Sequence, residues 1–152
     1  MGDASTETDQ STTRHDHELF WDHDSAPGDV AFTSAPVGEY SYVELRIASR
    51  PEAYRTEAFE VHGAVRKAGD DTFTDFTIRA VAPTVIANVP ASMRLEASQP
   101  LTIAIELGIG QLVQGVDWSA LPERDGKLRM DEQTPVALAS FCDALGHAFR
   151  AR

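Results

Sequence analysis

The segment from Phe59 to Ala80, FEVHGAVRKAGDDTFTDFTIRA, decides the fold class of this chain. Apolar and polar residues alternate from Phe59 to Val65, and the alternation returns from Phe76 to Ala80. A period of two places the apolar side chains on one face of a β-strand. Turn-forming residues occupy the intervening Ala68–Asp71 stretch. The segment therefore predicts two antiparallel strands joined as a hairpin.

The register inside this hairpin has one irregularity. Phe73 and Phe76 are three residues apart, so they cannot both belong to one face of a regularly alternating strand. An extra residue in one strand would restore the alternation. We therefore expect a β-bulge near Asp75.

Further strands are predicted on both sides of the hairpin. Apolar residues alternate with polar ones over residues 42–47, which indicates a half-buried strand. Short strands are also expected at residues 84–89, 93–97 and 101–107, with Pro90 separating the first two. Their connections are short and carry no helical pattern, which favours antiparallel pairing in a meander or a small β-sandwich.

The C-terminal segment has the pattern of an amphipathic helix. Thr134 is a helix N-cap type and Pro135 suits the first helical position, so we expect a helix over residues 135–150. Arg150 and Arg152 would lie at the negative end of its dipole. The apolar stripe consists of Leu138, Phe141, Cys142, Leu145 and Phe149. The predicted fold class is α+β, mainly antiparallel sheet with one C-terminal amphipathic helix.

Two segments before this helix are less regular. Residues 108–116, GIGQLVQGV, fit either a last strand or a loop loosened by glycine. Residues 117–130 are expected to form a loop that carries Trp118. The indole would either cover the core or anchor a partner.

The chain is expected to hold one domain behind a flexible arm. Its 152 residues suit a single core. Residues 1–25 are polar and acidic and form the predicted arm, and residues 26–152 form a single β-rich domain. No apolar run is long enough to cross a bilayer, and no secretory signal begins the chain. We therefore expect a cytoplasmic protein that does not bind membranes.

The net negative charge of the chain limits the classes of molecule that it is expected to bind. The formal net charge is −11, and residues 1–25 contribute −6 of it through seven acidic residues against Arg14 alone. A surface of this sign repels phosphate backbones and anionic lipids, which disfavours nucleic acid and membrane surfaces as partners. Cys142 is the single cysteine, so an intramolecular disulfide is excluded.

The predicted arm carries two candidate sites. Leu19, Phe20 and Trp21 form an apolar island that either docks on a partner protein or folds back onto the chain's own sheet. Around it lie side chains of the types that bind zinc, nickel or iron(II), although their spacing matches no established metal motif. The candidate metal ligands are His15, His17, His23 and Asp24.

Three other residues of the chain have reactive side chains. His62 or His147 could act as a general base if a cleft placed it beside a nucleophile, yet no nucleophile motif accompanies either. Cys142 lies on the apolar stripe of the predicted helix, where burial would raise the pKa of its thiol and suppress its reactivity.

These features favour a non-catalytic interaction or accessory protein without a cofactor. It would bind a protein partner, which includes a second copy of the chain, through Leu19, Phe20, Trp21 and Trp118. A first alternative is a ligand-binding or enzymatic β-fold with a pocket under the C-terminal helix, whose mouth carries His62, Tyr54 or Arg79. A second alternative is metal-dependent chemistry at the histidines of the arm.

Overall fold

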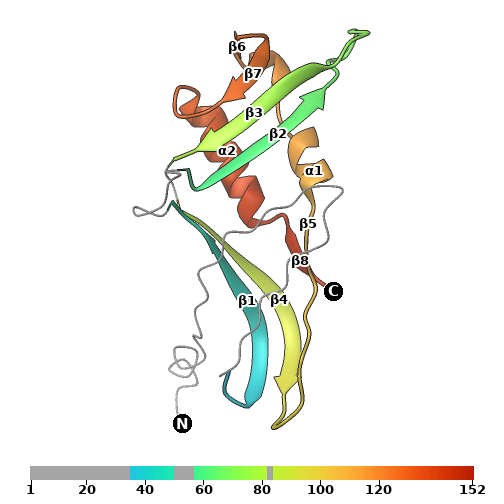
Figure 1. The fold of residues 1–152 in the computed structure, drawn as a ribbon, viewed down its shortest axis with the longest axis vertical. Coiled ribbons are helices and arrows are strands. Elements are labelled where there is room, and N and C mark those ends of the chain that lie inside the picture. Colours follow the sequence, from blue (N-terminus) through green and yellow to red (C-terminus); the bar gives the residue numbers. More distant parts are fainter. Residues whose placement is uncertain (1–34, 50–56, 82–83) are drawn as a thin grey trace. The chain divides into compact units, whose positions relative to one another are not determined.

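The computed structural model describes residues 35–49, 57–81 and 84–152 (Figure 1). The described residues belong to two compact units. The larger contains those within residues 41–92 and 102–152, and the smaller contains residues 35–40 and 93–101. Antiparallel pairing dominates the sheets, and one long helix lies near the C-terminus, which confirms the α+β class.

A four-stranded sheet organises the larger unit in the order β2-β3-β7-β6. It contains β2 (Phe59–Val65), β3 (Thr74–Ala80), β6 (Glu123–Arg124) and β7 (Lys127–Met130). β2 and β3 pair antiparallel, which confirms the predicted hairpin. On its other side β3 pairs with β7 in parallel, and β7 pairs antiparallel with β6. β3 is therefore an interior strand of this sheet.

The predicted bulge near Asp75 is wrong. The β2–β3 register runs without interruption from Phe59 opposite Ala80 to Val65 opposite Thr74. Phe73 precedes the strand and is 68% exposed, with the Arg66 guanidinium 5.7 Å from the centre of its ring. This cation–π contact stabilises the Phe73 ring at the surface. Phe73 therefore does not share the core-facing side of β3 with Phe76, and no bulge is required.

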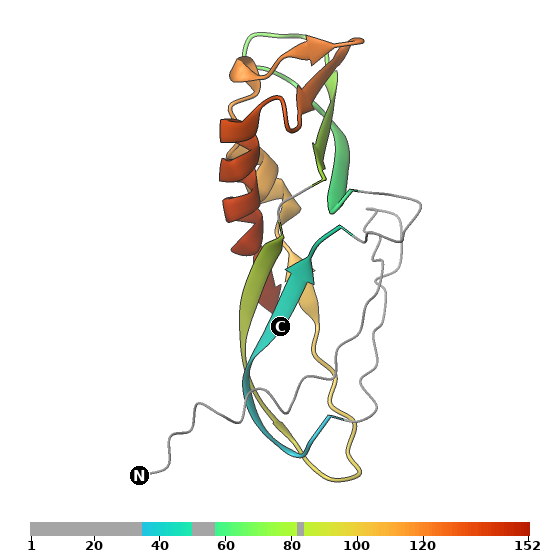
Figure 2. The same ribbon diagram turned by 90° about the vertical axis from the view of Figure 1, so that its left-hand side faces the viewer.

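The long helix α2 (Pro135–Gly146) covers one face of the four-stranded sheet (Figure 2). Phe59 of β2 meets Phe141 of α2 with ring centroids 6.0 Å apart. The buried apolar residues of the sheet and helix form one cluster, to which the short strands and β4 also contribute. Its sheet and α2 members are Phe76, Ile78, Ala80, Leu128, Met130, Leu138, Phe141, Cys142 and Leu145.

α2 begins as predicted and ends earlier than predicted. Thr134 is the N-cap residue and Pro135 lies in the first turn, but the helix stops at Gly146. A Cβ at Gly146 would lie 3.1 Å from the Ile86 carbonyl oxygen, so glycine permits this close approach to β4. Beyond it, β8 (Phe149–Ala151) pairs antiparallel with β5 (Ile105–Leu107).

The early end of α2 overturns the predicted roles of two arginines. Arg150 lies in β8 and Arg152 follows it, so neither occupies the last turn of the helix. The Arg152 backbone N–H donates to the Ala104 carbonyl oxygen at 2.8 Å. Pairing with β5 satisfies backbone groups of this segment, which favours a strand over continued helix.

β1 (Gly38–Ile47) and β4 (Val85–Leu95) pair in a two-stranded sheet. The predicted strand at 42–47 is confirmed and extends back to Gly38. The predicted break at Pro90 is wrong, because β4 continues through Pro90 and covers most of the segments expected at 84–89 and 93–97. Each strand of a two-stranded sheet has one unpaired edge. Pro90, which has no backbone N–H, can therefore lie within β4 without the loss of a hydrogen bond to β1.

The segment before α2 differs most from expectation. Of residues 101–107, only Ile105–Leu107 form a strand, and Ile109–Gln114 form the short helix α1 rather than a strand or loop. Residues 117–130 contain a 3₁₀ turn, Trp118–Ala120, and the β6–β7 hairpin rather than one loop. Asp125 and Gly126 join β6 to β7 with φ of 53° and 73°, the left-handed conformation of a tight hairpin turn.

Candidate functional site

The candidate residues of the predicted arm lie outside the described residues. This applies to the aromatic triplet Leu19, Phe20 and Trp21 and to the metal-ligand set His15, His17, His23 and Asp24. Both assignments stay predictions. Within residues 35–49, 57–81 and 84–152, no three His, Cys, Asp or Glu side chains group in a way that could hold a metal ion.

Trp118 packs against the core of the larger unit. Its ring lies 4.4 Å from that of Phe76, centroid to centroid, with a tilt of 43°. The indole N–H donates to the Val113 carbonyl oxygen at 3.1 Å. The side chain is half-buried, so its inner face supports Phe76 while part of it reaches solvent. A role for Trp118 in partner binding stays a prediction.

Asp117 stabilises the turn that carries Trp118. Its carboxylate accepts from the Ser119 hydroxyl at 2.6 Å and from the Ser119 backbone N–H at 3.1 Å. These bonds, the hydroxyl bond first, hold the pKa of Asp117 below its ordinary value. The turn is therefore strengthened by an ionised carboxylate, and its support is lost as the pH falls through this lowered pKa.

The face of the sheet that α2 leaves open carries a polar row across β2 and β3. His62 pairs with Thr77 in the register, and the Thr77 hydroxyl oxygen lies 3.4 Å from His62 Nδ1. His62 Nε2 lies 3.2 Å from Glu60 Oε1. A carboxylate, an imidazole and a hydroxyl thus follow one another, the residue types of a hydrolase triad.

This row lacks the further features that nucleophilic catalysis needs. The Thr77 residue is only 6% exposed, so little of it reaches solvent. Backbone N–H groups of β3 face β2 and β7 in the sheet ladders, so they cannot form an oxyanion hole there. The row is therefore a set of cross-strand contacts that stabilises the sheet.

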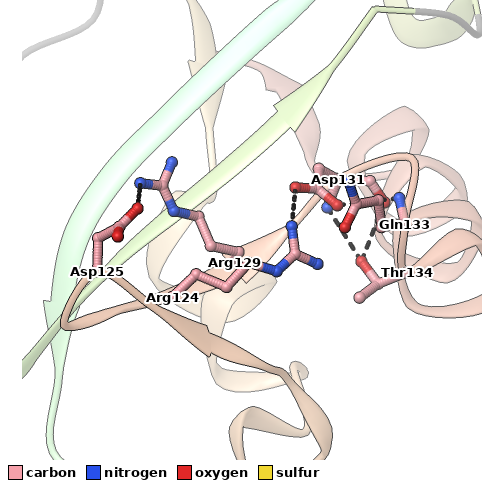
Figure 3. A network of polar contacts seen from close by, with 6 residues as sticks. All are labelled: Arg124, Asp125, Arg129, Asp131, Gln133 and Thr134. Atoms are coloured by element: carbon pink, nitrogen blue, oxygen red, sulfur yellow. Dashed lines mark hydrogen bonds and ion pairs between the residues drawn. The ribbon is translucent and has the colours of Figure 1, made fainter.

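A second network fixes the start of α2 to the β6–β7 hairpin (Figure 3). The Arg124 guanidinium donates to the Asp131 carboxylate at 3.2 Å, and the other Asp131 oxygen accepts from the Gln133 backbone N–H at 2.9 Å. The Thr134 hydroxyl donates to the Asp131 carbonyl oxygen at 3.0 Å. This network places α2 against the sheet and presents no group toward either cleft described below.

A small cleft of about 170 Å³ opens where α1 approaches the end of α2 and the start of β8. His147, Gln111 and Arg150 are the polar residues of its wall. Arg150 Nη2 donates to Gln111 Oε1 at 3.3 Å, and His147 Nδ1 lies 2.8 Å from the Asp143 carbonyl oxygen. The other lining residues are Gly108, Leu112, Ala144 and Ala148.

This cleft differs from the pocket expected under the C-terminal helix. His62 and Arg79 lie on exposed positions of the open sheet face, Arg79 in an ion pair with Glu57, and neither lines the cleft. Tyr54 lies outside the described residues. His147 does lie at a cleft, but its polar neighbours Gln111 and Arg150 were not expected from the sequence.

The smaller unit has its own, larger hollow of about 490 Å³. The Arg94 guanidinium lies in it between two carboxylates, 3.5 Å from Glu39 and 3.7 Å from Glu96. The other described lining residues are Val37, Gly38, Leu95 and Ala97. Arg94 is the only cation among the described lining residues, and two exposed acids compensate it, so these residues attract neither sign of charge strongly.

Cys142 is buried in the core, and burial raises the pKa of its thiol. We expect the native protein to react with a water-soluble aromatic disulfide at least ~10 times more slowly than free cysteine at pH 8, since both thiolate fraction and access are reduced. Absorbance of the released thiolate measures this rate. Reaction in concentrated urea should match free cysteine, and equal rates in the native state would contradict the burial.

No described helix is both long and apolar enough to cross a membrane. Comparisons with protein-family models, curated proteins and solved structures found no match to this chain. The site's own geometry and the sequence therefore carry the functional argument.

Proposed function

We propose that this protein is a non-catalytic accessory protein that binds a partner protein through Leu19, Phe20 and Trp21. The partner would offer an apolar depression for the aromatic rings, surrounded by basic side chains that attract the flanking acids. Aromatic anchors contribute most of the affinity in such interfaces, and complementary charge speeds the encounter.

The distribution of charge is the observation that carries this proposal. Residues 1–25 hold a net charge of −6 with a single base. In the described part, by contrast, several arginines are paired with acids close by, as in Arg79 with Glu57, Arg124 with Asp131 and Arg152 with Glu106. In the sequence, the strongest local excess of one charge therefore surrounds the aromatic triplet.

The placement of the other aromatic rings also supports the proposal. Phe59, Phe76 and Phe141 contribute to the core or pack on it, and Trp118 packs on Phe76. The described core is thus supplied with large rings from its own strands and helix. The proposal assigns Phe20 and Trp21 to a partner rather than to this core.

The proposal predicts that Phe20→Ala with Trp21→Ala weakens partner binding at least ~10-fold, because two large apolar contacts are lost. A partner captured on the full chain at low salt would be identified, purified and titrated by calorimetry. The same titration at about 0.5 M salt should show weaker binding, since screening reduces the attraction of the acidic flanks.

Phe73→Ala is the matched control, because it removes an exposed ring from the described part of the chain. It should leave the affinity unchanged. Unaltered affinity of the Phe20 and Trp21 double variant would refute the proposal. When the partner is a second copy of the chain, the same variants should lower the molar mass measured by light scattering.

A further inference from the structure

We propose that the cleft between α1 and the α2–β8 junction binds a small carboxylate that carries a neighbouring hydroxyl group, such as a short hydroxy acid. This site is independent of the partner proposal, because all of its residues belong to the larger unit. The inference rests on three polar side chains whose donor and acceptor atoms are fixed by their contacts.

Arg150 and Gln111 form the carboxylate-binding part. A guanidinium can only donate, so the atom of Gln111 that it contacts at 3.3 Å is the carbonyl oxygen. The Gln111 amide group is thereby oriented with its NH₂ as a remaining donor. Arg150 engages one terminal nitrogen in this contact and keeps further N–H groups. Two adjacent donors, one of them charged, match the two oxygens of a carboxylate.

His147 supplies the complementary acceptor. A carbonyl oxygen can only accept, so the contact between Nδ1 and the Asp143 carbonyl at 2.8 Å places the proton on Nδ1. In the neutral ring, Nε2 then carries the lone pair. A ligand hydroxyl can donate to that atom, which a carboxylate oxygen cannot do. The combination selects a ligand with both groups.

Size and charge agree with this ligand class. A cleft of about 170 Å³ is smaller than the roughly 300 Å³ and above of pockets for drug-sized ligands, so it suits a compact ligand. Leu112, Ala144 and Ala148 give it an apolar wall for a methyl group. Around it, Glu106 is paired with Arg150 in the β5–β8 register and forms an ion pair with Arg152 at 2.9 Å. Asp143, whose backbone carbonyl contacts His147, adds a second acid, so the charges nearby nearly balance and Arg150 itself supplies the cation that a carboxylate needs.

Titration with L-lactate, followed by ¹H–¹⁵N NMR at constant ionic strength, tests the site. We expect saturable shifts of the Gln111 side-chain amide and of the Gly108 and His147 backbone amides, with a Kd of about 1 mM for a ligand of this size. Propionate lacks the hydroxyl and should bind about 3 to 10 times more weakly. Equal affinities would overturn the acceptor role of His147.

Two variants separate the site from general attraction of anions. Arg150→Gln should weaken lactate binding about 10-fold, the effect of one charged hydrogen bond. Gln111→Glu keeps an oxygen for Arg150 but repels the ligand, so it should abolish saturation while the fold is retained. Arg46→Gln, which removes an exposed arginine from β1, should change nothing. Identical shifts with sodium chloride alone, or unaltered lactate binding in either cleft variant, would overturn the proposal.

Discussion

Leu128→Ala is expected to lower the free energy of unfolding by about 3 kcal/mol, because it leaves a cavity at the centre of the core. Leu128 is 0% exposed and lies opposite Phe76 in the parallel β3–β7 register. Neighbouring strands hold the backbone on both sides of β7, so the site cannot collapse onto the missing atoms. Urea unfolding, followed by far-ultraviolet circular dichroism, measures the change.

Val136→Ala is the control for this experiment. Val136 lies in the first turn of α2 and is 84% exposed, so the substitution should change the stability by less than about 0.5 kcal/mol. A loss below about 1 kcal/mol in Leu128→Ala would contradict the position of β7 inside the sheet.

β7 also shows why part of the sheet could not be predicted from the sequence. The strand has four residues, too few for a clear alternation, and its parallel partner β3 lies about 50 residues earlier. The hairpin signal was nevertheless present in Asp125 and Gly126, a pair typical of tight turns. The β2–β3 hairpin was predictable because its strands are longer and adjacent in the chain.

The misassigned helix α1 has a different cause. Residues 108–116 contain three glycines, which disfavour helix by local propensity. In the structure, Leu112 of this segment is buried, and the Gly108 backbone N–H donates to the Ala148 carbonyl oxygen at 2.9 Å. Tertiary contacts with the end of α2 therefore override the propensity, and no local pattern announces them.

The candidate cleft depends on the same kind of long-range contact. Gln111 and Arg150 are 39 residues apart, and the antiparallel pairing of β5 with β8 brings their segments together. His147 was recognisable as a potentially reactive residue from the sequence. Its polar neighbours were not, because Arg150 was expected in the last turn of a longer helix.

Gly63→Ala is expected to destabilise the protein by about 2 kcal/mol, although alanine is usually favoured over glycine in a strand. Gly63 faces Phe76 in the β2–β3 register, and a Cβ there would lie 2.7 Å from two atoms of the Phe76 ring. That ring is buried and packs on Trp118, so it can move only by displacing the indole. The substitution should therefore alter Trp118 as well as stability.

Gly110→Ala separates this steric effect from backbone entropy. A Cβ at Gly110 meets nothing within 4 Å and lies inside α1, so alanine should stabilise the protein by about 0.5 to 1 kcal/mol. Urea unfolding measures both variants, and near-ultraviolet circular dichroism reports on the packing of the Trp118 indole. If Gly63→Ala lowers the free energy of unfolding and Gly110→Ala raises it, the Phe76 ring occupies the space that a side chain at residue 63 would need. A stabilising Gly63→Ala with an unchanged near-ultraviolet spectrum would instead place that ring elsewhere, and with it the support that holds Trp118 against the core.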